Sequence, residues 1–329
     1  MEKKRFKEID ILRGMAIVLV LLGHAIIVYP VNLHKILWCN VLFTWLSTVH
    51  MPLFFLISGF CYSFRTNEYG RFWWKKTKRL LIPYLAFCIL DMLVRIAFGS
   101  LVNQQRGLLE SVKNMILAGG GDWFLYVLYI IFLIFPFIEK MIKKQPKVIP
   151  LLLGVLVLLE AFSVLPDIMM LESVGRYLIY FILGYLGKRW IARIKEIHMR
   201  IKSKDILLFL GVVVLWAMCV RWLVIYGMNP ILKLVAALLG IIAMWFVADS
   251  ISKKKNYLLN QFSKYSLPLY LMNGYLLVIS RTIVVSKWNI TNPIIIIAFN
   301  MFVTLFLAWI FIKYVIDKVK IFRIIFGME

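Results

Sequence analysis

The chain has few cysteines and lacks several common catalytic motifs. Its four cysteines, Cys39, Cys61, Cys88 and Cys219, are scattered, with no C-x-x-C pair. Neither a disulfide framework nor a metal site is therefore expected. The G-x-x-x-x-G-K-[ST], H-E-x-x-H and G-x-S-x-G patterns are also absent. Nucleotide hydrolysis, zinc-protease and serine-hydrolase chemistry thus have no support from motifs.

Acidic residues are also scarce, with 16 Asp and Glu against 39 Lys and Arg, which gives a formal net charge of +23. In a soluble protein this charge would suggest nucleic-acid binding. However, 62% of the 329 residues are hydrophobic, whereas ordinary globular chains are about 45–50% apolar. We therefore expect a membrane protein without a nucleic-acid partner, whose basic residues set its orientation and contact anionic membrane lipid.

Ten apolar segments are long enough to cross a bilayer, which requires roughly 20 residues per span. Within lipid, a single isolated span can satisfy its backbone hydrogen bonds only as a helix. The sequence therefore predicts an all-α, polytopic transmembrane helical bundle of about ten helices, forming a single membrane domain over 1–329. The expected spans are 11–29, 41–64, 80–101, 123–139, 148–165, 172–187, 205–225, 231–249, 265–285 and 293–313.

The distribution of Lys and Arg predicts the orientation of these spans. If the N-terminus is inside, the inner segments carry 30 of these residues and the outer segments carry 7, Arg281 among them. Basic residues are retained on the cytoplasmic side, so both termini are predicted to be cytoplasmic. The longest outer segment, 102–122, would form either a short helix over 108–117 or a plain loop.

Arg13 and His24 are the most informative ionisable pair, because charged groups inside spans are costly and often functional. Eleven residues of helix turn through about 1,100° and rise about 16 Å, so both side chains project from one face. His24 could act as a general base near neutral pH. A snorkelling arginine and a hydrogen-bonded core histidine would explain the same spacing.

Two further segments contain candidate residues with simpler explanations. Ser58 and Gly59 form a small-residue patch that admits a ligand or, somewhat better, a neighbouring helix. Lys76 and Arg79 are three residues apart, so on a helix they would form a compact phosphate site. The ordinary excess of cations in cytoplasmic loops would also explain them.

Four stretches carry a resemblance to a known family: "EIDILRGMAIVLVLLGHA", "HMPLFFLISGFCYSF", "KKTKRLLIPY" and "DWFLYVLY". In their order and spacing they resemble the acyltransferase 3 family of integral-membrane O-acyltransferases. The second stretch looks most like the fucose 4-O-acetylase branch. "YFILGYLGKR" and "FSKYSLPLYLMN" are similar to its later signature helices.

This resemblance implies a plasma-membrane enzyme that moves an acetyl or other acyl group from cytoplasmic acyl-CoA. The acceptor would be a hydroxyl of a cell-surface or lipid-linked carbohydrate. Acetyl-CoA would be a co-substrate, and no bound cofactor is implied.

The resemblance also assigns roles to residues of this chain. His24 and Arg13 match the family's catalytic pair. Arg13 would also help to bind the acyl donor, together with residues of two other family motifs. Asn273 stands where many members have histidine and could orient a substrate hydroxyl. His50, Asp122 and Trp123 are further acceptor-side candidates, although solvation would explain His50 and an interfacial aromatic belt would explain Trp123. The donor motif residues are Lys76, Arg79, Ser58 and Gly59. Whether His24 acts as a base or carries the acyl group stays open.

Two other classes of membrane protein fit part of the pattern. A transporter or flippase of a lipid-linked sugar would have a similar number of helices, but it should show broken helices in symmetry-related halves. A membrane sensor or scaffold would not require Arg13 and His24 on one helical face. The sequence therefore favours the acyltransferase.

Overall fold

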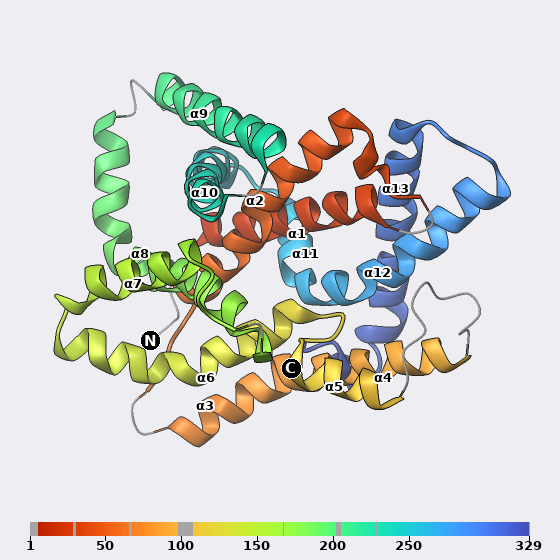
Figure 1. Cartoon of the computed structure of the whole chain (residues 1–329), viewed down its shortest axis with the longest axis horizontal. Helices are drawn as coiled ribbons and strands as arrows, with labels where there is room; N and C mark the ends of the chain where they lie inside the picture. The colour runs from red at the N-terminus through yellow and green to blue at the C-terminus, as the bar shows by residue number, and fades with distance from the viewer. Residues whose placement is uncertain are drawn as a thin grey trace. The chain divides into compact units, whose positions relative to one another are not determined.

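The computed structural model describes residues 6–28, 31–65, 68–97, 108–166, 168–201, 205–227 and 229–328. These residues form helices and turns, with no strand among them (Figure 1). The all-α fold class expected from the composition is confirmed.

Eight of the ten expected spans correspond to helices that are long and apolar enough to cross a membrane. The seventh to tenth expected spans become α9, α10, α12 and α13, and the last two of these continue into π-helical turns. The sixth is the Ile168–Ile191 stretch, which joins a short 3₁₀ turn to α8. The eight spans are carried by α1 (Lys7–Ile27), α2 (Leu37–Phe60), α6 (Trp123–Lys144), α8 (Leu171–Ile201), α9 (Asp205–Tyr226), α10 (Pro230–Ser252), α12 (Ser266–Thr282) with η6 (Ile283–Lys287), and α13 (Pro293–Phe311) with η7 (Ile312–Ile316).

The two remaining expected spans are shorter helices in the described part of the chain. The fifth is α7 (Val148–Ala161), which has 14 residues. The third consists of the π-helical turn η2 (Thr77–Leu81) followed by α4 (Ile82–Ala97), and its end falls outside the described residues. Of the two alternatives for 108–117, the short helix is present, as α5 (Leu108–Leu117).

Three more short helices lie in segments that were expected to be cytoplasmic. They are α3 (Tyr69–Lys76), α11 (Tyr257–Lys264) and α14 (Lys320–Ile325). The start of α11 is capped by Asn256, whose side chain accepts a hydrogen bond of 3.0 Å from the backbone N–H of Leu259. Such a cap satisfies one of the N–H groups that a helix start leaves free.

The chain divides into two compact units. Unit 1 contains residues 1–61 and 180–313, and unit 2 contains residues 62–179 and 314–329. In unit 1, α1 lies among α2, α10, α11, α12 and α13 (Figure 1). Of its most apolar 18-residue stretch, 61% is buried, against 17% for α9. Arg13 and His24 are therefore on the central helix of unit 1, whereas α9 exposes its apolar side chains in the way a lipid-facing helix does.

Close backbone packing joins α2 to the part of α8 that belongs to unit 1. A Cβ atom at Gly59 would lie 2.0 Å from the carbonyl oxygen of Phe181, and one at Gly184 would lie 1.9 Å from that of Leu56. Only glycine permits these approaches, as at other small-residue contacts between membrane helices.

In unit 2, α6 packs on α3, α7 and η2, and α4 packs on α5, α14 and η2. The buried side chains Ile131, Phe132 and Phe135 of α6 form part of its core, together with Tyr62. The hydroxyl of Tyr62 donates to the buried carboxylate of Glu139 at 3.0 Å.

Candidate active site

Arg13 lies near the junction of α1 with the end of α2. Its Nη2 donates to Cys61 Sγ at 3.3 Å, and its Nη1 lies 3.8 Å from Asp10 Oδ1. The side chain is 25% exposed. The guanidinium is thus held by two weak partners and keeps an accessible surface, as an anion-binding group requires.

His24 and His50 are brought together by the packing of α1 against α2. Their imidazoles are near enough for an electrostatic interaction, and Lys233 of α10 also acts on His50. His24 is half-buried, and His50 is 9% exposed. The sequence placed these two histidines separately, one as the catalytic residue and the other on the acceptor side. The separate roles of the two histidines stay predictions.

The hydrogen bond of His50 determines its tautomer. Nδ1 lies 2.6 Å from the carbonyl oxygen of Leu46, one turn earlier on α2. A carbonyl oxygen only accepts hydrogen bonds, so Nδ1 must carry the proton and donate it. In the neutral imidazole, Nε2 then has the free lone pair and is able to accept a hydrogen bond or a proton.

Asn273 of α12 has a buried acceptor that lacks a protein partner. The residue is 2% exposed, and its Oδ1 makes no hydrogen bond within the described residues. An unsatisfied buried polar atom costs about 1–3 kcal/mol. A hydroxyl group of a bound molecule would satisfy this oxygen, and the acceptor-side role of Asn273 stays a prediction.

Ser58 and Gly59 lie near the end of α2. Ser58 is half-buried, whereas Gly59 is buried against the backbone of α8. The packing explanation is therefore confirmed for Gly59. The donor-binding role of the pair stays a prediction.

Lys76 and Arg79 lie in unit 2, on a segment that changes its helical form. Lys76 ends α3, and Arg79 is exposed in the π-helical turn η2. The Nζ of Lys76 is 3.5 Å from the ring centroid of Phe132, a cation–π contact. The segment is helical as expected, but the wider π turn changes the angle between the two side chains from that in an α-helix.

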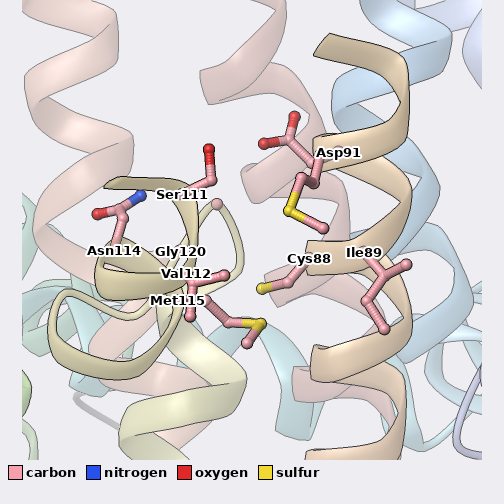
Figure 2. Close-up of a pocket in the computed structure, with 10 residues that line it drawn as sticks. Cys88, Ile89, Asp91, Ser111, Val112, Asn114, Met115 and Gly120 are labelled. Atoms are coloured by element: carbon pink, nitrogen blue, oxygen red, sulfur yellow. The ribbon is translucent and has the colours of Figure 1, made fainter. Parts of the chain in front are cut away.

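Asp122 and Trp123 lie at the start of α6, beside a cavity of about 60 Å³ between α4, α5 and the turn at Gly120 and Gly121. Figure 2 shows the oxygens of Asp91 and Ser111 at one end of this cavity, and the sulfurs of Cys88 and Met115 at the other. The Trp123 ring packs on Tyr177 at 5.3 Å between centroids.

The carboxyl group of Asp122 binds its proton more tightly than an ordinary aspartate does. Burial, and to a smaller extent the neighbouring carboxylate of Asp91, raises the pKa of Asp122 to about 7. Its side chain is therefore partly protonated near neutral pH and then serves as a hydrogen-bond donor as well as an acceptor.

One buried cation was missed by the sequence analysis. Arg281, which was counted in an outer segment, lies in the last turn of α12 with its side chain fully buried. The signal was present, since an arginine four residues before the end of an apolar span falls under the rule for intramembrane charge. Its burial depends on contacts with α1 and α13 that the sequence does not reveal.

The candidate residues thus form two groups. Unit 1 holds Arg13, His24, His50, Ser58, Gly59 and Asn273, and unit 2 holds Lys76, Arg79, Asp122 and Trp123. The first group combines a cation, two imidazoles and a buried amide around α1. The second group combines a half-buried lysine and an exposed arginine with two residues beside a small cavity.

This helical fold with ionisable groups in its spans defines a multi-pass membrane protein, and comparison with known families gives its class. The acyltransferase-domain model of the acyltransferase 3 family matches residues 6–313. The chain belongs to this family, as its motifs predicted.

A known protein also matches part of the chain. Nodulation protein NolL of Sinorhizobium fredii (strain NBRC 101917 / NGR234) is 31% identical over 129 residues. The match covers 38% of this chain and 34% of NolL, so the chain spans about a third of that relative's length. No solved structure matches the chain.

Proposed function

We propose that the protein transfers an acetyl or other acyl group from cytoplasmic acyl-CoA to a hydroxyl of a cell-surface or lipid-linked carbohydrate. The enzyme would act in the plasma membrane, with acyl-CoA as a co-substrate. The observation that carries this proposal is the position of His24 on α1, the central helix of unit 1, near enough to His50 of the adjacent helix α2 for an electrostatic interaction. Two imidazoles within a membrane bundle are costly unless they have a function.

In the proposed reaction, His24 accepts the proton of the acceptor hydroxyl while the hydroxyl oxygen attacks the thioester carbonyl carbon. The carbon–sulfur bond then breaks, and the CoA sulfur leaves as a thiol after taking the proton from His24. An ester and free CoA are the products. In a variant of this route, His24 first takes the acyl group itself and then passes it to the hydroxyl.

His50 and Asn273 are proposed to orient the acceptor. Because Nδ1 of His50 is held by Leu46, its Nε2 faces the substrate as an acceptor. The unpartnered Oδ1 of Asn273 would accept a second hydroxyl hydrogen bond. Such groups fix the reacting hydroxyl in position, which accounts for a large part of enzymatic rate enhancement.

The donor would be held by cations. Acyl-CoA carries several phosphates, and Arg13, Lys76 and Arg79 all belong to segments predicted at the cytoplasmic side. Arginine in particular binds phosphate through two parallel hydrogen bonds. Asp122 and Trp123, in a segment predicted at the outer side, would contact the carbohydrate.

Purified protein in lipid nanodiscs, incubated with labelled acetyl-CoA, tests this function. We expect labelled ester on a polysaccharide or lipid-linked sugar acceptor, together with slow thioester hydrolysis or self-acylation when no acceptor is added. The competing transporter function predicts counterflow of a labelled sugar through proteoliposomes, with no covalent change in either substrate. That second result would contradict the proposal.

A further inference from the structure

Arg281 is a buried cation whose hydrogen bonds all go to neutral groups. Its side chain is 0% exposed, and it donates a hydrogen bond to Ala25, a member of an apolar cluster that includes residues of α1, α2, α12 and α13. Within the described part of the chain, its recorded acceptors are two backbone carbonyls and one side-chain amide. Burying a guanidinium is costly unless its donors are satisfied, so this arrangement must be held for a reason.

The guanidinium joins three helices of unit 1. Nη1 donates to the carbonyl oxygen of Val31 at 2.5 Å, and Nη2 donates to that of Ala25. Asn300 of α13 completes the network when its amide oxygen faces the guanidinium. Its Oδ1 then accepts from Nε at 2.7 Å and from Nη2 at 3.1 Å, and its amide nitrogen donates to Ser280 Oγ at 2.7 Å.

Ala25, the residue that Arg281 holds, directly follows His24. Because α1 ends at Ile27, the carbonyl of Ala25 is among the last four, which the helix cannot satisfy by itself. A cation at a helix C-terminus also interacts favourably with the helix dipole. Arg281 thus binds both the last turn of α1, through Ala25, and the chain that follows it, through Val31.

We propose that Arg281 is a positioning residue for the acyl transfer, which sets the orientation of the His24 imidazole by capping the last turn of α1. This inference rests on the proposed role of His24. Arg281 is not proposed to touch substrate, since four of its five N–H donors have recorded acceptors and its side chain is fully buried. Its effect reaches the reaction through the backbone of one helical turn.

The test compares four variants in nanodiscs, with kcat and the KM for acetyl-CoA as readouts. Arg281→Gln removes the cation, and Asn300→Leu removes the amide that holds it while keeping the arginine. Thr304→Val is the matched control for Asn300→Leu. Thr304 lies four residues further along α13 and is 1% exposed, and its hydroxyl has no hydrogen-bond partner among the residues that the structure describes. Arg281→Lys retains a cation with fewer donors.

We expect Arg281→Gln to lower kcat by about tenfold to a hundredfold, the size of effect that a misplacement of about 1 Å produces. The KM for acetyl-CoA should change by less than about twofold, because the cations proposed to bind the donor are untouched. Arg281→Lys should recover part of the lost kcat, and Asn300→Leu should show a smaller loss. Thr304→Val should keep the wild-type rate.

Hydrogen exchange supplies a second readout. The backbone amides of residues 26–28 should exchange faster in Arg281→Gln and Asn300→Leu than in the wild type. Their exchange rates in Thr304→Val should equal those of the wild type. If Arg281→Gln does not fold, Arg281→Lys and Asn300→Leu still decide the matter.

Wild-type kcat in folded Arg281→Gln, or in both Arg281→Lys and Asn300→Leu, would overturn the inference. An equal loss in Thr304→Val and Asn300→Leu would also overturn it, since the effect would then be one of general packing. Failure of the proposed function is a separate result: His24→Ala would keep wild-type transfer. An inactive His24→Ala beside fully active Arg281 and Asn300 variants would refute only the positioning role.

Discussion

Among individual side chains, three histidines show how the surroundings define different roles. His24 is half-buried on the central helix of unit 1, and His50 is held by the Leu46 carbonyl. His34 lies in the short 3₁₀ turn Leu33–Lys35 that follows α1, where its ring packs on Phe43 at 5.1 Å. His34 therefore offers a natural control for changes at the other two.

Asp122 should make the stability of the protein depend on pH. A carboxyl in an unfolded chain titrates near 3.9, whereas burial raises the pKa of Asp122 to about 7 in the folded protein. Between these two values the folded state binds more protons than the unfolded state, so the free energy of unfolding falls as the pH rises. Above about pH 7 no further loss from this group occurs.

Asp122→Asn, which resembles the protonated carboxyl, should therefore reduce the decrease in Tm between pH 5 and pH 8 in detergent. Glu110→Gln serves as the control, because it removes an exposed carboxylate on the nearby helix α5. Thermal unfolding followed by tryptophan fluorescence gives the comparison. The same pH dependence in the wild type and Asp122→Asn would show that Asp122 does not cause it.

From the sequence alone, candidate residues could be named where a rule applies to a single position, but contacts between distant residues could not be predicted. The eleven-residue spacing marked Arg13 and His24 without knowledge of the fold. The proximity of His24 to His50, the unpartnered oxygen of Asn273 and the burial of Arg281 depend on which helices pack together. The contacts between helices cannot be predicted from a single sequence.

Among the helices, hydrophobic patterning predicted type and position well. The bounds of α5 agree with the expected 108–117, and eight expected spans are present as long apolar helices. The π turns at 77–81, 283–287 and 312–316 were not predicted. A π turn adds a residue to a helical turn without changing the apolar composition, so hydropathy has no signal for it.

The contact between α2 and α8 predicts opposite effects for two glycines of the same helix. Gly184→Ala should destabilise the protein by about 1–3 kcal/mol, as overpacking does, because the added Cβ would meet the carbonyl of Leu56. Gly187→Ala should be neutral or stabilising by up to about 1 kcal/mol, because a Cβ there has nothing within 4 Å. Equal Tm values for the two variants would contradict this packing.

The segment from α3 to α4 carries the cations proposed to bind the donor. Lys76→Ala combined with Arg79→Ala should raise the KM for acetyl-CoA about tenfold, which corresponds to about 1.4 kcal/mol of binding free energy. Lys75→Ala with Lys78→Ala removes the same charge from exposed positions of the same segment and is the matched control. The prediction concerns KM in initial-rate measurements, with kcat little changed.

If the two double variants raise KM equally, the effect comes from overall charge rather than from a phosphate site. An unchanged KM for acetyl-CoA in the double variant Lys76→Ala with Arg79→Ala would show that these residues do not bind the donor.

For the protein as a whole, composition and charge bias predicted a multi-pass membrane protein, and the motifs predicted its family. Both predictions are confirmed. The division into two compact units, each built from separate stretches of the chain, was not predicted. Hydropathy along the chain reports local burial in lipid, whereas the units depend on contacts between distant segments such as 1–61 and 180–313.

His24 is the residue proposed to perform the transfer. The most direct test of this role is acyl transfer from labelled acetyl-CoA by wild-type protein, His24→Ala and His34→Ala, each purified in nanodiscs with matched Tm. We predict that His24→Ala forms no acylated acceptor and still binds acetyl-CoA, while His34→Ala keeps wild-type turnover. Acylated acceptor formed at the wild-type rate by His24→Ala would contradict the account.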